Sequence, residues 1–245
     1  MKQFEAVGYI INRKSLSDSD RILTVFTKEY GKISLVAKGI KKPRAKLQPH
    51  LEPLVETGFR YIGSAKLPVL VGAQATKKNN YYGAELNISL SALFVTEVLG
   101  LITIEAQPNQ TLYALYDDFL YELTHSSKIG LDLVYMLLNM MKASGIEPNI
   151  LDVSTKDILY FNFDDGTITS QASSGRSLKL SSQIAKLWKA CLSYHKETVL
   201  RIRVDQVVIN RSLALLTDYL QYHYSKKIKS YKVLVNSTNF LQATA

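Results

Sequence analysis

Over the first 80 residues, short runs rich in Val, Ile, Thr, Tyr and Phe alternate with polar segments of the kind that form turns. The runs predict five β-strands: Phe4–Asn12, Arg21–Thr27, Lys32–Lys38, Leu54–Gly63 and Leu67–Thr76. Five short strands in such a short stretch suit a small closed barrel. An SH3-like barrel fits the number of strands nearly as well, so the strand pattern alone leaves the type of barrel open.

Beyond residue 80, apolar residues return at the spacing of a helix face. Helices are expected at Ile88–Glu105, Asn109–Ser127, Gly130–Gly145, Ser177–His195 and Asn210–Leu234. Asp157–Ser170 instead predicts a β-hairpin, because Asp165-Gly166 supplies residues that tolerate positive φ in a tight turn. We therefore expect an α+β protein. Its barrel domain takes residues 1–80, and its helical domain takes residues 81–245 with a small inserted β-hairpin module at about 150–178.

The composition fits a folded protein with a substantial core, since 47% of the residues are hydrophobic and 21% are charged. No apolar run approaches the roughly 20 residues needed to cross a bilayer, and the N-terminal segment lacks the pattern of a signal peptide. The single cysteine, Cys191, excludes an internal disulfide and a cysteine-rich zinc site. These features indicate a cytoplasmic protein.

The net charge of +9 is unevenly distributed along the chain. Residues 1–80 hold 15 Lys/Arg against 6 Asp/Glu, whereas residues 81–245 hold 15 against 15. Solubility alone gives no reason for such a division, but a polyanion-binding domain joined to a neutral domain does. Membrane-surface binding would also use basic charge, but the first 80 residues hold no amphipathic helix to accompany it.

The densest basic segment follows the third predicted strand, within Leu35–Pro53. Five basic side chains fall within nine residues: Lys38, Lys41, Lys42, Arg44 and Lys46. A charged run of this kind is often only a solvated face. Aromatic residues of the barrel could stack on bases if they were exposed beside these cations, although aromatic residues in small barrels more often lie in the core. The candidates are Tyr9, Phe26, Tyr30, Phe59 and Tyr61.

The sequence holds no catalytic motif of the common hydrolase, nucleotide-binding or kinase types. The four histidines are far apart in sequence, and none has a His or Cys partner at metal-ligand spacing. Asp18 and Asp20 invite a metal-binding interpretation, but a capping or ion-pair role beside Arg21 is the simpler one. We expect a protein that is not an enzyme.

The segment Arg13–Leu54 resembles the RecO family of bacterial recombination mediators. The resemblance rests on Ser19-Asp20-Arg21, on Ile-Leu-Thr-Val-Phe-Thr-x-Glu-x-Gly-Lys after it, and on an Ala-Lys-Gly with basic residues following. Weaker similarities follow at Gly145–Pro148 and Tyr219–Leu234.

This resemblance implies an N-terminal OB-fold β-barrel, a helical domain and a small inserted module. It implies a protein of DNA repair and homologous recombination that acts after DNA damage in the RecFOR pathway, in the cytoplasm and on the nucleoid. The family binds single- and double-stranded DNA and anneals complementary strands. With its partner RecR, it loads RecA onto DNA coated by the single-stranded-DNA-binding protein. The C-terminal tail of that coating protein is expected to dock in a pocket of the helical domain.

In an OB barrel, a basic loop beside the binding face follows the phosphates of the strand. The expected DNA-binding residues are Arg13, Arg21, Lys32, Lys38, Lys41, Lys42, Arg44 and Lys46. Many family members also bind zinc through paired cysteines in the inserted module, but Leu151–Ser174 contains none. We therefore expect no zinc and no other cofactor, and a hairpin held by packing through Ile158, Tyr160, Phe161 and Phe163.

Two other functions remain open on the residues alone. A basic barrel protein could act on RNA or on the ribosome, because phosphate contacts do not distinguish the two nucleic acids. A nuclease would need carboxylates or histidines that meet in space, and none are close in the chain.

Overall fold

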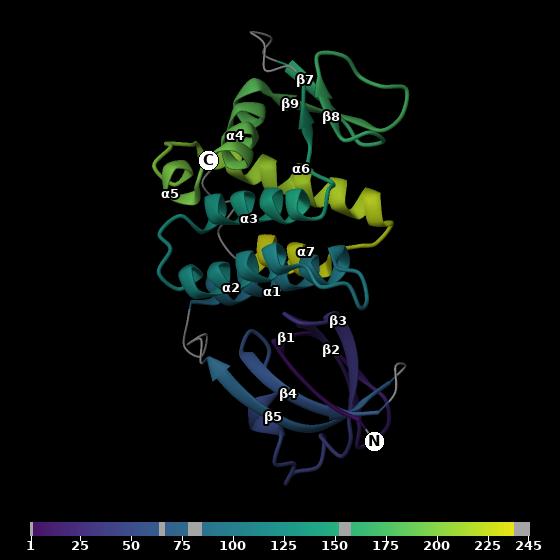
Figure 1. Cartoon of the computed structure of the whole chain (residues 1–245). Coiled ribbons are helices and arrows are strands. Elements are labelled where there is room, and N and C mark those ends of the chain that lie inside the picture. The colour runs from purple at the N-terminus through teal and green to yellow at the C-terminus, as the bar shows by residue number, and fades with distance from the viewer. Residues whose placement is uncertain (1, 64–66, 78–84, 152–157, 238–245) are drawn as a thin grey trace. The chain divides into compact units, whose positions relative to one another are not determined.

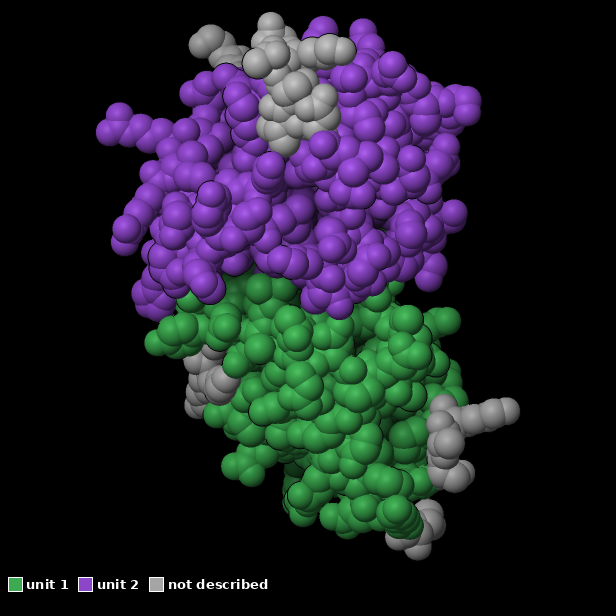
Figure 2. Space-filling view, turned by 45° about the horizontal axis from the view of Figure 1, so that its top comes forward, with its two compact units in different colours: residues 1–84, 96–124 green, residues 85–95, 125–245 purple. Residues whose placement is uncertain are grey.

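The computed structural model describes residues 2–63, 67–77, 85–151 and 158–237. The chain divides into two compact units, which are coloured separately in Figure 2. Unit 1 comprises residues 1–84 and 96–124, and unit 2 comprises residues 85–95 and 125–245. The boundary passes through helix α1 (Leu86–Ile102), which begins in unit 2 and ends in unit 1.

Unit 1 contains a closed five-stranded barrel (Figure 1). Its strands are β1 (Gln3–Ser15), β2 (Arg21–Thr27), β3 (Gly31–Ala37), β4 (Glu56–Ile62) and β5 (Val69–Lys77). The long strand β1 pairs with β4 through its first half and with β2 through its second half, on either side of Gly8. The barrel closes through a parallel contact of Val36 with Val69. This order, β1-β2-β3-β5-β4, confirms the five predicted strands and is that of an OB-fold.

Alternating residues of the strands fill the barrel interior, as the period of two predicts. Leu23, Val25 and Leu35 are almost fully buried there together with Phe59. Of the five aromatic residues considered for base stacking, four are buried, and only Tyr30 is exposed, at 39%. All but Tyr30 are thus buried, and Phe59 and Tyr61 belong to the barrel core.

Helix α2 (Gln110–Leu123) packs on the outer surface of the barrel. Its apolar side chains Leu112, Phe119, Leu120 and Leu123 are buried, and Leu115 is half-buried. The Tyr9 ring of β1 lies 5.1 Å from that of Tyr116 and 5.9 Å from that of Tyr113, measured between centroids. Phe26 of β2 also contacts Tyr113, at 5.8 Å. The Tyr9 hydroxyl donates a hydrogen bond to Asp117, and its burial raises the pKa of Tyr9. The end of the β1–β2 surface near Tyr9 is therefore covered by the chain itself.

The Gly-Lys pair at the start of β3 joins the barrel to the segment after α1. Gly31 has a φ of 67°, and a Cβ there would lie 2.1 Å from the Gln107 carbonyl oxygen, so only glycine permits this approach. The Lys32 ammonium donates to the carbonyl oxygens of Gly100, at 3.1 Å, and Thr103, at the C-terminal end of α1. A cation at this end of a helix also interacts favourably with the helix dipole.

Unit 2 is built around helix α3 (Ile129–Ala143), which is buried along most of its length as predicted. Around it lie α4 (Ser182–Ser193), α5 (Lys196–Val199), α6 (Gln206–Tyr224) and α7 (Lys229–Ser237) (Figure 1). The helix predicted at Asn210–Leu234 is two helices, because Ser225 adopts a left-handed conformation, with a φ of 51°, and ends α6. No helix within the described ranges is long and apolar enough to cross a membrane.

A small sheet of order β6-β8-β7-β9 belongs to unit 2. Its strands are β6 (Asn149–Ile150), β7 (Ile158–Asn162), β8 (Thr167–Thr169) and β9 (Ser177–Ser181). The predicted hairpin is confirmed as β7 and β8, with Gly166 at a φ of 68° in the turn. The prediction of helix from Ser177 was wrong: Ser177–Ser181 alternates polar and apolar residues and pairs with β7, and Ser181 then caps α4.

Packing stabilises the inserted module, but only part of the predicted set contributes. The Phe161 ring lies 5.0 Å from Phe163, 5.3 Å from Trp188 and 4.8 Å from Tyr219, and all four side chains are buried. Ile158 is 54% exposed, because alternate residues of a strand point to opposite faces. The expected role of Ile158 in the core was therefore wrong.

In the inserted module, the segment Thr169–Ser174 is held by hydrogen bonds to the buried Asn162. Its Oδ1 accepts from the Ser173 N–H at 2.9 Å and from the Ser177 hydroxyl at 2.6 Å. Residues 152–157 of the module lie outside the described residues.

Candidate nucleic-acid interface

The predicted basic loop follows β3 and runs through a series of turns to a short 3₁₀ helix, η1 (Gln48–His50). The side chains of Lys38, Lys42, Arg44 and Lys46 are exposed along it, whereas Lys41 is partly buried. Gly39, with a φ of 64°, makes the first turn, and the Lys42 N–H donates to its carbonyl oxygen at 3.1 Å. The loop therefore presents four ammonium or guanidinium groups to solvent from a folded backbone.

The loop between β1 and β2 holds the basic loop through Asp20. An Asp20 carboxylate oxygen accepts the Gly39 N–H at 2.7 Å and the Ser19 hydroxyl at 2.9 Å. These hydrogen bonds, that of Gly39 first, hold the pKa of Asp20 below its usual value. Lys41 completes the connection, because its N–H donates to the Ser19 carbonyl at 3.0 Å and its ammonium to the Ser17 carbonyl at 2.6 Å.

This connection defines what we call the Asp20 clamp: Ser17, Ser19, Asp20, Gly39 and Lys41. It explains the Ser-Asp and Lys-Gly parts of the sequence pattern by hydrogen bonding. It also places the basic loop beside the β1–β2 loop, which is one of the loops with which OB-folds bind oligonucleotides.

Removing the Asp20 carboxylate should loosen the basic loop. We expect Asp20→Ala to make the Gly39 amide exchange its hydrogen roughly tenfold faster, because a charged acceptor is lost. The depressed pKa means that the clamp is intact at neutral pH and is lost only as the pH falls through the folded-state pKa of Asp20. Hydrogen exchange followed by NMR checks this, with the exposed Asp18→Ala as the control; equal rates at Gly39 in both variants would contradict the clamp.

The three remaining predicted cations are less accessible to a DNA phosphate than those of the basic loop. Arg13 is partly buried and forms an ion pair with Glu52 at 3.7 Å. Arg21, the first residue of β2, is partly buried opposite Ser15 and Ala37 at the same end of the barrel. The Lys32 ammonium is bound to the helix carbonyls described above. The structure thus brings most of the predicted set to one end of the barrel but engages Lys32 elsewhere.

Lys14 was not among the predicted residues but belongs to this end of the barrel. It is exposed on β1 and pairs in register with Ile22, one residue from Arg21. The signal for Lys14 is the alternation of exposed and buried residues along β1, which continues past the register shift between Ile10 and Asn12. We define the basic end of the barrel as Lys14, Arg21, Lys38, Lys41, Lys42, Arg44 and Lys46.

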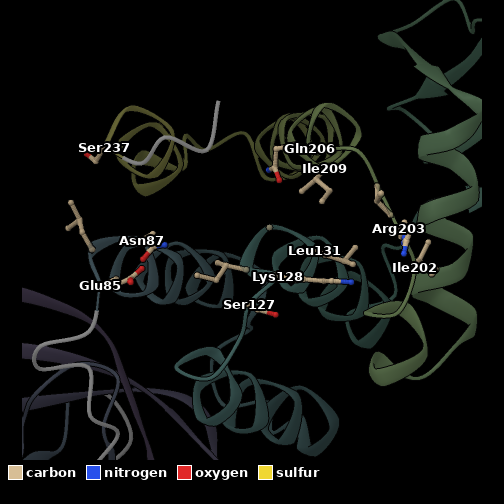
Figure 3. Close-up of a pocket in the computed structure, with 14 residues that line it drawn as sticks. Glu85, Asn87, Ser127, Lys128, Leu131, Ile202, Arg203, Gln206, Ile209 and Ser237 are labelled. Atoms are coloured by element: carbon tan, nitrogen blue, oxygen red, sulfur yellow. The ribbon is translucent and has the colours of Figure 1, made fainter. Parts of the chain in front are cut away.

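Unit 2 contains a separate pocket of about 810 Å³, shown in Figure 3. Apolar side chains line it from α3, from the segment before α6 and from α6 itself, including Leu131, Ile202 and Ile209. Lys128 runs along the pocket toward the end where Arg203 and Ile202 lie (Figure 3). Arg203 is exposed, and the Lys128 ammonium donates to the Leu200 carbonyl. The pocket therefore combines an apolar lining with two cations, Lys128 and Arg203, and one carboxylate, Glu85.

Within the described part of the chain, no three His, Cys, Asp or Glu side chains come close enough to hold a metal ion. Asp18 and Asp20 do not gather further carboxylates around them, and Asp20 accepts backbone and hydroxyl hydrogen bonds instead.

Comparisons with known proteins match nearly the whole length of this chain to one family. The family model "Recombination protein O N terminal" matches residues 1–78, and "Recombination protein O C terminal" matches residues 84–232. The chain is similar to a DNA repair protein RecO of Desulforamulus reducens, 24% identical over 248 residues, with 94% of this chain and 93% of the relative covered. A protein of the same name from Pelotomaculum thermopropionicum is 23% identical over 242 residues, with 96% and 94% covered. The chain therefore belongs to the RecO family.

Proposed function

We propose that this protein acts in DNA repair and homologous recombination as a mediator that binds single- and double-stranded DNA and anneals complementary strands. Together with RecR, it helps to load RecA onto DNA coated by the single-stranded-DNA-binding protein. Membership of the RecO family supports the proposal, as do the names of the relatives, which are DNA repair proteins. No turnover chemistry is part of it.

The observation that carries the DNA-binding part is the basic end of the barrel. Seven basic side chains come together there on an OB-fold, and the Asp20 clamp fixes the loop that holds five of them. Phosphate contacts of this type position a strand without reading its sequence. Binding is therefore expected to depend little on base sequence and strongly on salt.

We further propose the pocket of Figure 3 as the docking site for the acidic C-terminal tail of the coating protein. Arg203 would pair with the carboxylates of the tail, and the apolar lining around Ile202 and Ile209 would receive its apolar side chains. A small apolar pocket with a few placed charges is suited to a short peptide terminus.

Annealing of complementary strands, with and without the coating protein, tests this function. We expect the wild-type protein to accelerate both reactions. Arg203→Ala should slow annealing of coated strands by about tenfold, because a charge-assisted contact to the tail is lost, and should leave annealing of naked strands unchanged. Lys189→Ala, an exposed cation of α4 outside the pocket, is the matched control. A wild-type protein that accelerates neither reaction would refute the proposed function.

A further inference from the structure

A second basic and aromatic hollow lies entirely within unit 2, between the small sheet and the C-terminal end of α6. Its volume is about 810 Å³. Its lining residues include Phe163, Arg176, Tyr222, Lys226 and Lys227. Neither the proposed barrel site nor the pocket of Figure 3 uses any of these residues.

Arg176 is held in this hollow by two aromatic rings. Its guanidinium carbon lies 5.1 Å from the ring centroid of Phe163 and 5.7 Å from that of Tyr222. These distances are typical of cation–π contacts, which fix the plane of the guanidinium and leave its N–H groups directed outward. No carboxylate within the described residues lies at ion-pair distance from Arg176. Arg176 is therefore oriented by rings and carries an N–H array available to an anion.

Tyr222 supplies an accessible aromatic surface next to this guanidinium. Phe163 is buried, whereas Tyr222 is 39% exposed. Its hydroxyl donates a hydrogen bond to Asp164, which fixes the ring and engages one of the two carboxylates of the hollow. A base could stack on the exposed part of this ring without rearrangement of the backbone.

The end of α6 adds two ammonium groups. Ser225 ends the helix in the left-handed conformation, and the Lys226 N–H then donates to the Gln221 carbonyl at 3.2 Å. This turn places Lys226 and Lys227, both exposed, on the rim of the hollow beside the exposed His223. Three permanent cations thus face two carboxylates, Asp164 and Asp218.

The charge of unit 2 as a whole favours an anionic ligand. Its residues, 85–95 and 125–245, hold 15 Lys/Arg and 10 Asp/Glu, a net charge of +5. Five of the acidic residues that balance the C-terminal sequence belong to unit 1: Glu97, Glu105, Asp117, Asp118 and Glu122. The helical unit is therefore not neutral.

We propose that this hollow is a second nucleic-acid site, which holds a strand separate from the one bound at the basic end of the barrel. Arg176, Lys226 and Lys227 contact its phosphates, and one base stacks on Tyr222. Exposed aromatic faces beside cations are what sequence-independent binding of single strands requires. The inference rests on the proposed function, because annealing brings two complementary strands together and a second site would hold one of them.

The lining favours a nucleic acid over an acidic peptide. The hollow offers the exposed rings of Tyr222 and His223 and several cations, but no apolar side chain besides the rings for a peptide to bury. A peptide terminus would gain little there, whereas a nucleotide has both a flat base and a phosphate.

The test counts strands bound to the full-length protein by native mass spectrometry, with short oligothymidine of two distinguishable lengths as the probe. We expect the wild-type protein to take up two strands. The variant Arg176→Ala/Lys226→Ala/Lys227→Ala should take up one, with the dissociation constant of the second strand raised roughly 100-fold at about 0.1 M salt, from about fivefold per lost phosphate contact. The same variant should also anneal naked complementary strands more slowly, because fewer protein molecules then hold a second strand.

Two further variants show whether the loss of the second strand comes from the cations of the hollow, from misfolding or from the lower net charge. Lys226→Glu/Lys227→Glu leaves the Arg176 stack intact and should also lose the second strand. Lys189→Ala/Arg201→Ala/Arg211→Ala removes three exposed cations of unit 2 outside the hollow and should retain both strands.

A wild-type protein that binds one strand would overturn the second site and leave the proposed function standing, whereas one that binds none would overturn both. Two strands bound equally by the wild type and the hollow variants would also overturn it. So would variants that keep both strands but lose the tail peptide of the coating protein, since the hollow would then be a peptide site.

Discussion

Replacing Lys42, Arg44 and Lys46 together with alanine is expected to weaken single-stranded DNA binding about 100-fold at about 0.1 M salt. Each phosphate contact to a single strand contributes roughly 0.7 to the slope of log affinity against log salt, and hence about fivefold at this salt concentration. Three lost contacts should therefore also reduce the slope by about 2. Fluorescence anisotropy of a labelled oligonucleotide over a range of salt concentrations measures both quantities.

The choice of these three residues follows from the Asp20 clamp. Lys41 is left in place, because its ammonium and its N–H both hold the loop, and its removal would mix disorder with lost charge. The matched control is Lys2→Ala/Lys28→Ala/Arg60→Ala, which removes the same charge from exposed positions of the barrel outside the basic end. If both triple variants lose the same affinity, the loop acts only through net charge. If neither does, the basic run is a solvated face.

Competition of unlabelled RNA with the labelled DNA oligonucleotide of equal length tests the alternative of an RNA-binding protein. A strand held through its phosphates alone offers little basis for distinguishing the two, because the 2′-hydroxyl is what separates RNA from DNA at a site. A marked preference of the wild-type protein for RNA would favour the alternative.

The barrel and its basic loop were predictable because both are encoded locally. Runs rich in Val, Ile, Thr, Tyr and Phe, separated by turn segments, predicted the five strands to within a few residues, and the five cations of the loop are neighbours in the sequence. The module around Asp165-Gly166 was predictable for the same reason. β9 was missed because Ser177–Ser181 is too short to separate a strand from the first turn of the helix that follows.

The role of Lys32 was not readable from the sequence, because its partners are 68 and 71 residues away. In the sequence, a lysine in a basic domain is simply one more cation. The approach of Gly31 to Gln107 and the backbone pairing of Lys32 with Glu105 and Ala106 bring the end of α1 to its ammonium. The covering of Tyr9 and Phe26 by α2 is a long-range contact of the same kind.

The charge pattern was misleading for a related reason. Counting along the chain assigned all of the excess to residues 1–80, but α2 and the end of α1 pack on the barrel and bring five carboxylates to it. Unit 1 then holds 15 Lys/Arg against 11 Asp/Glu, a net charge of +4. The domain boundary at residue 80 stays a prediction, and a fragment ending there would expose Tyr9 and Phe26, which are fully buried in the whole chain.

The largest expected effect on stability comes from a single ion pair in unit 2. Asp132 lies in the first turn of α3 and is 1% exposed. Its Oδ1 pairs with the Lys196 ammonium at 3.0 Å, and its other oxygen accepts from the Ser126 hydroxyl. We expect Lys196→Met to destabilise unit 2 by about 3 kcal/mol, because it leaves a buried carboxylate without its cation. The Ser126 hydrogen bond and the partial exposure of Lys196 keep the loss at the lower end of the usual range.

Trp188 makes this loss measurable in unit 2 alone. It is the single tryptophan of the chain and is fully buried against Phe161, so urea unfolding followed by its fluorescence reports on this unit. Lys189→Met, an exposed change on α4, should cost less than about 0.5 kcal/mol. The double variant Asp132→Leu/Lys196→Met should recover much of the loss, because replacing both charges removes the cost of an unpaired buried one. A single variant as stable as Lys189→Met, or a double variant less stable than the single, would show that the pair does not stabilise the start of α3.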